Sequence, residues 1–213
     1  MKRFPAPPFI VKVCGITSEE DARVALEAGA NALGFNFYPK SPRYIEPERA
    51  GEILDRLAGE FLCVAVFVNP AAEELARIAN MIRCDIVQLH GQSCPNRVPD
   101  ACRLWRCLTA FSVPPEKDDT VDAYLLDADS PGFGGSGKLI DWKLAAMFPY
   151  RKIIAGGLDA ENVAAAIAAT APDGVDACSR LEARPGKKDP ARVRGYVREA
   201  LAAARAFVAG GNR

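Results

Sequence analysis

Two side chains able to transfer protons end short apolar runs that lie far apart in this 213-residue sequence. Cys14 ends the run Ile-Val-Lys-Val-Cys, and Asp127 ends Tyr-Leu-Leu-Asp. A thiolate can remove a proton, and a carboxyl group whose pKa is raised by partial desolvation can donate one. Each residue also has a structural interpretation, Cys14 as a small hydrophobic filler and Asp127 as a cap of the glycine-rich segment 134–137. If the fold brings them together, they form an acid–base pair.

Strand alternation predicts which residues face the same side as these two. Cys14 has the parity of Ile10 and Lys12, and Asp127 has that of Leu125. Side chains of equal parity lie on one face of a strand, so Lys12 would point inward one layer below the thiol. Our hypothesis is that this ammonium lowers the pKa of Cys14 and favours the thiolate.

Two further segments carry groups that bind anions. Gly156 and Gly157 stand between an apolar run and a predicted helix, where backbone N–H groups could approach a ligand at the positive end of the helix dipole. Ser179 follows the next apolar run and adds a hydroxyl group. Two glycines alone can simply make a tight turn, but with the second loop we predict a phosphate site.

Arg43 and His90 also follow predicted strands. Arg43 comes after the stiff turn 38–42, which contains two prolines, and His90 comes directly after the fourth apolar run. A guanidinium there could clamp a carboxylate through two hydrogen bonds, or it could be an ordinary solvated charge of a loop. We count both residues as candidates for substrate binding.

These candidates require a fold that gathers the ends of many strands. Short, β-branched apolar runs alternate with helix-like segments along the whole chain, which predicts a parallel sheet covered by helices. The predicted strands are 10–14, 32–37, 62–68, 86–89, 104–111, 124–127, 152–155 and 175–178.

Eight such units predict an α/β fold of one domain, a closed (β/α)8 TIM barrel, whose lower size limit is about 200 residues. The alternative is an open doubly wound sheet, which usually carries a glycine-rich phosphate loop after its first strand. Here that turn reads Cys-Gly-Ile-Thr, so the barrel is favoured. The fourth and fifth units are the weakest, because 93–100 and 114–122 have little helical pattern.

Helix limits follow from capping residues. Thr17 and Glu20 have the spacing of a capping box, and Asp159 is the expected N-cap of a helix at 159–169, with Leu158 and Val163 as a hydrophobic staple. The other predicted helices cover 46–57, 71–82 and the segment from Pro190 to about 207.

Composition excludes several classes of protein. Lys+Arg 27 balances Asp+Glu 27, so we expect no nucleic-acid partner. The longest apolar run, 61–68, is too short to span a membrane.

Residues 1–9 resemble an N-terminal extension rather than a signal peptide. The barrel domain would cover 10–208, and 209–213 would be a tail. Seven cysteines without a CxxC pair, with His90 as the single histidine, predict reduced thiols in the cytoplasm and no zinc site.

Several strings, in this order, resemble the phosphoribosylanthranilate isomerase family of tryptophan biosynthesis over about residues 10–205. They are KVCGIT at 12–17, GFNFYPKSPRYI at 34–45, VFVN at 66–69, VQLHG at 87–91, GGSGK at 134–138 and PGKKD at 185–189. The resemblance implies a (β/α)8 barrel that performs an Amadori rearrangement of N-(5-phosphoribosyl)anthranilate, a small phosphorylated substrate, with no cofactor or metal.

By that resemblance, Asp127 is the general acid that protonates the furanose ring oxygen, and Cys14 is the general base that removes the C2′ proton. Arg43 falls where the family engages the anthranilate carboxylate, and Gly156, Gly157 and Ser179 fall where it holds the phosphate. These roles agree with the chemistry argued from the residues.

One segment departs from the family pattern. Many members read Asp-Val-Ser-Ser-Gly-Val-Glu, whereas this chain has Cys178 in place of a serine and Arg180 in place of a glycine. Arg180 adopts positive φ less easily than glycine, so either the loop differs or its guanidinium binds the phosphate directly. Both alternatives stay open at this point, and Arg180 is counted among the candidates for substrate binding.

Two other functions stay open from the sequence. A related barrel isomerase of the histidine-pathway type would act on another phosphoribosyl aminoaldose, but such enzymes pair two aspartates where this chain has Cys14. A non-catalytic barrel that binds phosphosugars is the third interpretation. A monomer is favoured, and a homodimer is compatible with the neutral charge.

Overall fold

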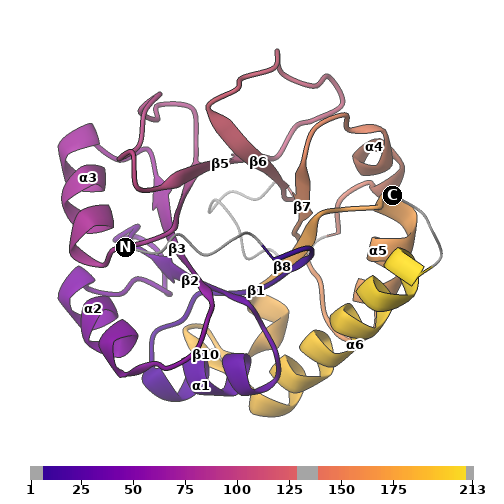
Figure 1. The fold of residues 1–213 in the computed structure, drawn as a ribbon, viewed down its shortest axis with the longest axis horizontal. Coiled ribbons are helices and arrows are strands. Elements are labelled where there is room, and N and C mark those ends of the chain that lie inside the picture. The colour runs from indigo at the N-terminus through magenta and orange to yellow at the C-terminus, as the bar shows by residue number, and fades with distance from the viewer. Residues whose placement is uncertain (1–6, 129–138, 210–213) are drawn as a thin grey trace.

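The strands β1 to β8 close into a parallel barrel in the computed structural model of this chain, which describes residues 7–128 and 139–209 (Figure 1). The barrel closes where β8 pairs with β1, in the register Val11↔Val175 and Val13↔Ala177. This confirms the predicted (β/α)8 class over the open sheet. The strands are β1 (Ile10–Cys14), β2 (Ala32–Asn36), β3 (Leu62–Val68), β4 (Ile86–His90), β5 (Arg103–Leu108), β6 (Val121–Leu126), β7 (Lys152–Ile154) and β8 (Gly174–Ala177).

Helices surround the barrel but do not follow every strand (Figure 1). The connections 91–102 and 109–120, which are described throughout, contain no helix, as the weak pattern in the fourth and fifth units predicted. The helices are α1 (Glu19–Glu27), α2 (Pro47–Arg56), α3 (Ala72–Met81), α4 (Trp142–Met147), α5 (Val163–Thr170) and α6 (Pro190–Ala209).

Burial on both faces explains why the strands read as continuous apolar runs. All five residues of β1 and all five of β4 are buried, because one face lines the barrel interior and the other packs against helices. The interior cluster includes Ile10, Val64, Trp105, Leu125 and Ile153. It fills the lower part of the barrel and leaves polar side chains at the carboxyl ends of the strands.

Two predicted caps are wrong. Ser18, not Thr17, caps α1: its Oγ accepts the Asp21 N–H at 3.2 Å, while the Thr17 hydroxyl donates to the Gly186 carbonyl. Helix α5 begins at Val163 rather than at 159, because Asp159 caps a preceding turn by accepting the Glu161 N–H at 2.9 Å.

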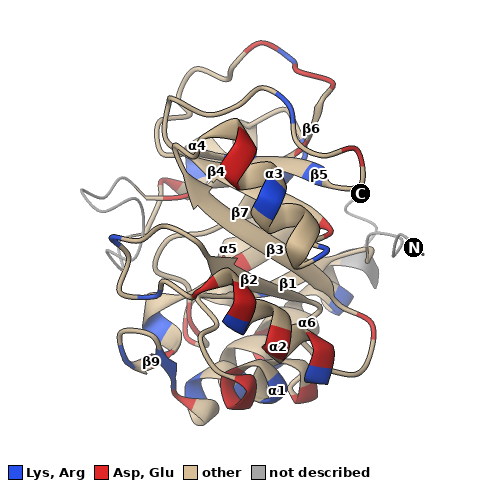
Figure 2. Cartoon of the chain, turned by 90° about the vertical axis from the view of Figure 1, so that its left-hand side faces the viewer, with Lys and Arg blue, Asp and Glu red and all other residues tan. Residues whose placement is uncertain are grey.

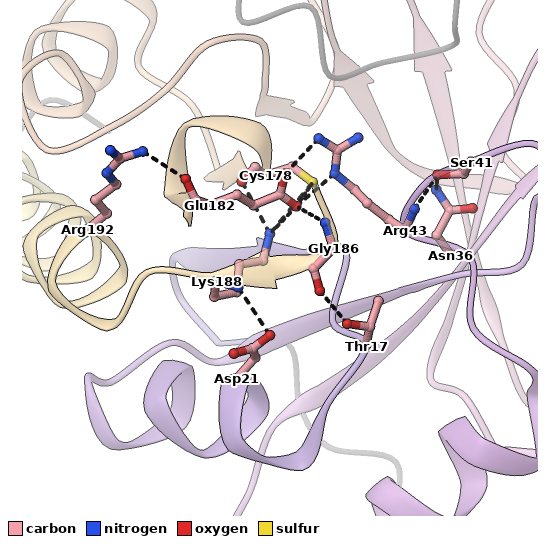
Figure 3. Close-up of polar contacts among 10 residues, drawn as sticks. All are labelled: Thr17, Asp21, Asn36, Ser41, Arg43, Cys178, Glu182, Gly186, Lys188 and Arg192. Carbon is pink, nitrogen blue, oxygen red and sulfur yellow. Dashed lines mark hydrogen bonds and ion pairs between the residues drawn. The ribbon is translucent and has the colours of Figure 1, made fainter. Parts of the chain in front are cut away.

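The segment after β8 forms a small structure that the sequence did not predict. A 3₁₀ turn, η1 (Ser179–Leu181), leads into the antiparallel pair β9 (Glu182–Arg184) and β10 (Lys187–Lys188). Asp21 at the start of α1 accepts the Lys188 N–H at 3.1 Å (Figure 3). The first and last βα units are thereby joined at the mouth of the barrel.

Acidic and basic residues both occur in α1 and in α2, as the colours of the ribbon indicate (Figure 2). Within the described ranges, no helix combines the length and apolar content that crossing a membrane requires. The string at 134–138 and most of the predicted terminal segments lie outside the described residues, and the proposed domain boundaries stay predictions.

Candidate active site

A cavity of about 390 Å³ opens at the carboxyl ends of the strands. It brings together four of the predicted site residues, Cys14, Arg43, His90 and Asp127, which come from loops or strand ends far apart in the sequence. Asn36, Gln88, Asp176 and Cys178 also line it, and sequence reasoning did not place them in the site. Gly156, Gly157, Ser179 and Arg180 lie on the neighbouring loops after β7 and β8 rather than in this lining.

Asp127 directly follows β6. Its backbone N–H donates to the Leu108 carbonyl of β5 at 3.0 Å, which holds the residue at the end of the strand. Its Oδ1 accepts the Ala128 N–H at 2.8 Å. Burial raises the pKa of Asp127 to about 6, and the charge of Asp176 adds to this effect. The expected rise in pKa is confirmed, and a fraction of this carboxyl is protonated near neutral pH.

Cys14 ends β1 with its thiol against the backbone of β2. A Cβ atom at Gly34 would lie 2.7 Å from Cys14 Sγ, so glycine makes the space that the thiol occupies. A hydrogen bond with Cys178 and burial raise the pKa of Cys14 well above its usual value, although Lys12 opposes them. Lys12 does lower the pKa of Cys14, as the hypothesis states. The prediction of a net lowered pKa is wrong, because the hydrogen bond with Cys178 and burial together raise the pKa more than Lys12 lowers it.

Lys12 lies inside the barrel with Asp176 of β8 as its partner. Lys12 Nζ is 2.9 Å from Asp176 Oδ1, and both side chains are buried. Burial raises the pKa of Asp176 to about 7, even though Lys12 lowers it. The alternation that placed Lys12 in the interior could also have identified Asp176, which shares the parity of Cys178 and the site.

His90 and Gln88 form a polar wall of the cavity. Their Nε2 atoms are 2.7 Å apart. Burial lowers the pKa of His90 to about 4, so the imidazole is neutral; Gln88 donates, and the His90 proton is on Nδ1. The buried Oε1 of Gln88 has no hydrogen-bond partner within the described part of the chain. Buried polar atoms without a partner are rare in folded proteins, and the Gln88 side chain borders the cavity.

Arg43 is held by a carboxylate of the protein itself. Its Nε and Nη2 donate to the two oxygens of Glu182, each at 2.8 Å (Figure 3). Lys188 Nζ lies 3.2 Å from Glu182 Oε1, and the backbone N–H of Arg43 donates to Ser41 Oγ at 3.1 Å. This network fixes the plane of the guanidinium at the cavity.

Cys178 lies between these charges and the Cys14 thiol. Lys188 Nζ is 3.8 Å from Cys178 Sγ and donates to the Cys178 carbonyl at 3.2 Å (Figure 3). The hydrogen bond from Cys14 lowers the pKa of Cys178 to about 6, with further help from Lys188 and Arg43 and against the effect of burial. In this pair, Cys178 therefore carries the charge and Cys14 the proton.

The loops after β7 and β8 lie together, as predicted. Gly156 and Gly157 both have positive φ, +82° and +62°, a conformation that glycine adopts without steric cost. Arg180 Nη1 donates to Asp159 Oδ2 at 2.9 Å and so links the two loops. Since α5 begins at Val163, its N-terminus lies farther along the chain than we expected.

Comparison with known proteins supports the same interpretation. A family model described as N-(5'phosphoribosyl)anthranilate (PRA) isomerase matches residues 11–199. The N-(5'-phosphoribosyl)anthranilate isomerase of Solibacter usitatus is 43% identical over 199 residues, which cover 92% of this chain and 98% of that protein.

Two solved structures have the same fold. A phosphoribosyl anthranilate isomerase in complex with reduced 1-(o-carboxyphenylamino)-1-deoxyribulose 5-phosphate has a TM-score of 0.75 and 33% identity, with 91% of this chain and 99% of that chain covered. Monomers generated from the dimeric enzyme of Thermotoga maritima have a TM-score of 0.75 and 34% identity, with 91% and 99% covered. By sequence, fold and the residues at the mouth of its barrel, this chain belongs to the N-(5'-phosphoribosyl)anthranilate isomerase family.

Proposed function

We propose that this chain catalyses the Amadori rearrangement of N-(5'-phosphoribosyl)anthranilate to 1-(2-carboxyphenylamino)-1-deoxyribulose 5-phosphate in tryptophan biosynthesis. The observation that carries this proposal is the single cavity lined by Cys14, Asp127 and Arg43 in a chain of this family. An acid, a base and a cation at one barrel mouth are what opening and isomerising an anionic aminosugar requires.

Asp127 is the general acid in the first step. Its proton goes to the furanose ring oxygen, the bond from that oxygen to C1′ breaks, and the nitrogen lone pair forms the C=N bond of a Schiff base. The raised pKa of Asp127, about 6, keeps part of the enzyme in the proton-donating form near neutral pH.

Cys14 is the general base in the second step. The Schiff base makes the C2′ proton acidic, the thiolate removes it, and the resulting enolamine tautomerises to the ketone. Cys14 becomes a thiolate by passing its proton along its hydrogen bond to Cys178, and Lys12 stabilises the charge that develops.

The remaining residues hold the substrate by its two anionic ends. Arg43 has five N–H donors, of which Glu182 takes two, and it presents a fixed cation to the anthranilate carboxylate. Gly156, Gly157, Ser179 and Arg180 bind the phosphate with backbone and guanidinium N–H groups. His90 and the unpaired Gln88 oxygen bind a sugar hydroxyl, so that positioning accounts for much of the acceleration.

The test is a fluorescence assay that follows consumption of phosphoribosylanthranilate by the purified, reduced protein. Cys14→Ala and Asp127→Asn should each lower turnover by about a hundredfold or more, the usual contribution of an acid or base. The histidine-pathway aminoaldose serves as the control substrate and should not turn over. Near-normal rates in either variant would contradict the assigned roles, and calorimetric binding without turnover in the unmodified protein would favour a binding barrel instead.

We further propose that the protein acts in the cytoplasm as a monomer. None of the seven cysteines, all of which lie in the described residues, forms a disulfide, and the proposed base needs a reduced thiol, which a reducing compartment maintains. Large apolar side chains that are exposed in the described residues, such as Met81 and Val113, belong to different elements. Light scattering after gel filtration tests the monomer, because family structures include both a dimeric enzyme and monomers made from it.

A further inference from the structure

Cys14 and Cys178 lie next to the point where the barrel closes. The parallel register of β1 and β8 runs Lys12↔Asp176 and Val13↔Ala177, and Cys14 and Cys178 directly follow this last pair. Adjacent strands are about 4.8 Å apart. A disulfide requires a Cα separation of roughly 4.4–6.8 Å, and the pairing of Val13 with Ala177 brings the two following residues near this range.

The two sulfurs also point into the same space. Both residues line the active-site cavity, and their side chains share a hydrogen bond. A Cβ atom at Gly34 would lie 2.7 Å from Cys14 Sγ, and one at Gly15 would lie 2.9 Å from Cys178 Sγ. Each sulfur therefore lies against a glycine backbone that leaves room for it at the cavity.

We propose that Cys14 and Cys178 are a redox modification site, at which a hydroperoxide converts the two thiols into a reversible intramolecular disulfide. The proposal goes beyond the isomerase activity, because it assigns a second chemistry to the same strand ends. Its formation does not depend on the proposed function; its effect on turnover does, because that effect rests on Cys14 as the base.

The chemistry balances in two displacements. The Cys178 thiolate attacks one peroxide oxygen, the O–O bond breaks, and a sulfenic acid forms while the leaving hydroxide takes up a proton to become water. Cys14 sulfur then attacks the sulfenic sulfur, the S–O bond breaks, and the departing hydroxide accepts the Cys14 proton as a second water. The two sulfurs lose two electrons in total, which the peroxide gains.

Charges around the pair select Cys178 as the attacking sulfur. Lys188 Nζ is 3.8 Å from its Sγ, Arg43 lies on the same cavity, and Glu182 holds both of these cations. With a pKa of about 6, Cys178 is a thiolate at neutral pH. It is also half-buried on the open cavity, whereas Cys14 is buried, so peroxide reaches Cys178 first.

A second thiol pair in the same chain provides an internal comparison. Cys84 Sγ and Cys102 Sγ are 3.6 Å apart, on segments that precede β4 and β5 at the opposite end of the barrel. The hydrogen bond with Cys102 and burial raise the pKa of Cys84 well above its usual value. Every interaction on Cys84 raises its pKa, so it remains a thiol and this pair should react later.

The experiment treats the folded, reduced protein with hydrogen peroxide, blocks remaining thiols by alkylation and maps disulfides by mass spectrometry. Trypsin places Cys14 in peptide 13–23 and Cys178 in peptide 153–180, while Cys84 and Cys102 fall in 84–97 and 98–103. The expected result is linkage of 13–23 to 153–180 before linkage of 84–97 to 98–103. The Cys178→Ser variant should lack the first link, and Cys102→Ser, the matched control, should keep it.

Turnover is followed in parallel. As the Cys14–Cys178 link accumulates, turnover should fall by about a hundredfold or more, and dithiothreitol should restore it. The proposal is overturned if Cys14 and Cys178 both remain alkylatable thiols after the peroxide is consumed, or if the Cys84–Cys102 link forms first. Reduced protein without turnover would instead contradict the proposed function, and the disulfide would still be measured independently.

Discussion

Lys12 Nζ lies 2.9 Å from Asp176 Oδ1 inside the barrel, one side-chain layer below Cys14, and both residues are buried. Two opposite charges removed from water depend on one another, because either alone would be a buried, uncompensated charge. The pair connects β1 to β8 at the seam of the barrel. It therefore contributes to stability and to the electrostatics of the site.

We expect Lys12→Met to destabilise the protein by about 3–5 kcal/mol at pH 8, because the buried Asp176 carboxyl loses its cation and must take up a proton to become neutral. Urea unfolding measures this loss. The double variant Lys12→Met/Asp176→Leu should recover most of it, because an apolar pair needs no compensation. If Lys12→Met is as stable as the unmodified protein, the two charges do not depend on one another.

In the folded Lys12→Met variant the pKa of Cys14 should rise further, since Lys12 lowers it. An unchanged titration of the Cys14 thiol would contradict the role given to Lys12.

The pKa of Asp127, about 6, predicts the pH dependence of turnover. A general acid must carry its proton, so kcat/KM should fall as pH rises through about 6, by about tenfold per pH unit where this step limits the rate. The measurement is a pH profile of kcat/KM. The residual activity of Asp127→Asn should lack this limb, and persistence of the limb in the variant would assign it to another group.

The same carboxyl should appear in the pH dependence of stability. A folded-state pKa above the unfolded value means that the folded protein binds the proton more tightly, so this group's contribution falls as pH rises from about 4 to about 6. Relative to the unmodified protein, Asp127→Asn should therefore gain about 1–3 kcal/mol between pH 3 and pH 8. Unfolding curves at the two pH values provide the comparison, and equal differences at both would contradict the raised pKa.

Arg43→Lys should raise KM by about tenfold or more and change kcat much less, because lysine cannot pair with Glu182 and a carboxylate in one plane. Steady-state kinetics separates the two parameters. Glu182→Gln is the companion variant: it keeps Arg43 but loosens its orientation, so the expected rise in KM is smaller. A KM unchanged in Arg43→Lys would show that another group holds the anthranilate carboxylate.

Arg180→Gly restores the residue common in the family and tests phosphate binding. If Arg180 contributes a guanidinium to the phosphate, this change should weaken competitive inhibition by inorganic phosphate by about tenfold. Arg180→Lys keeps the charge and should lie between the two. Asp159→Asn removes the carboxylate that is 2.9 Å from Arg180 and should strengthen phosphate inhibition. Equal inhibition of the unmodified protein and Arg180→Gly would leave Asp159 as the main partner of Arg180.

The sequence alone determined the barrel and four of the residues that line the cavity at its mouth, Cys14, Arg43, His90 and Asp127. Alternation of apolar runs with helical segments predicted every strand of the barrel, although β5, for example, was predicted as 104–111 and is Arg103–Leu108. Parity along β1 correctly placed Lys12 and Cys14 inside. These features are local, since side-chain direction repeats every two residues and burial on both faces demands apolar residues.

Only the tertiary structure decided which groups are partners. Arg43 pairs with Glu182, 139 residues away, and Thr17 binds Gly186 instead of capping α1. The pKa of Cys14 is raised although Lys12 is nearby, because closure of the barrel places Cys178 against it. Hydrogen bonds and charge interactions depend on distances and burial in space, and residue spacing along the chain does not contain them.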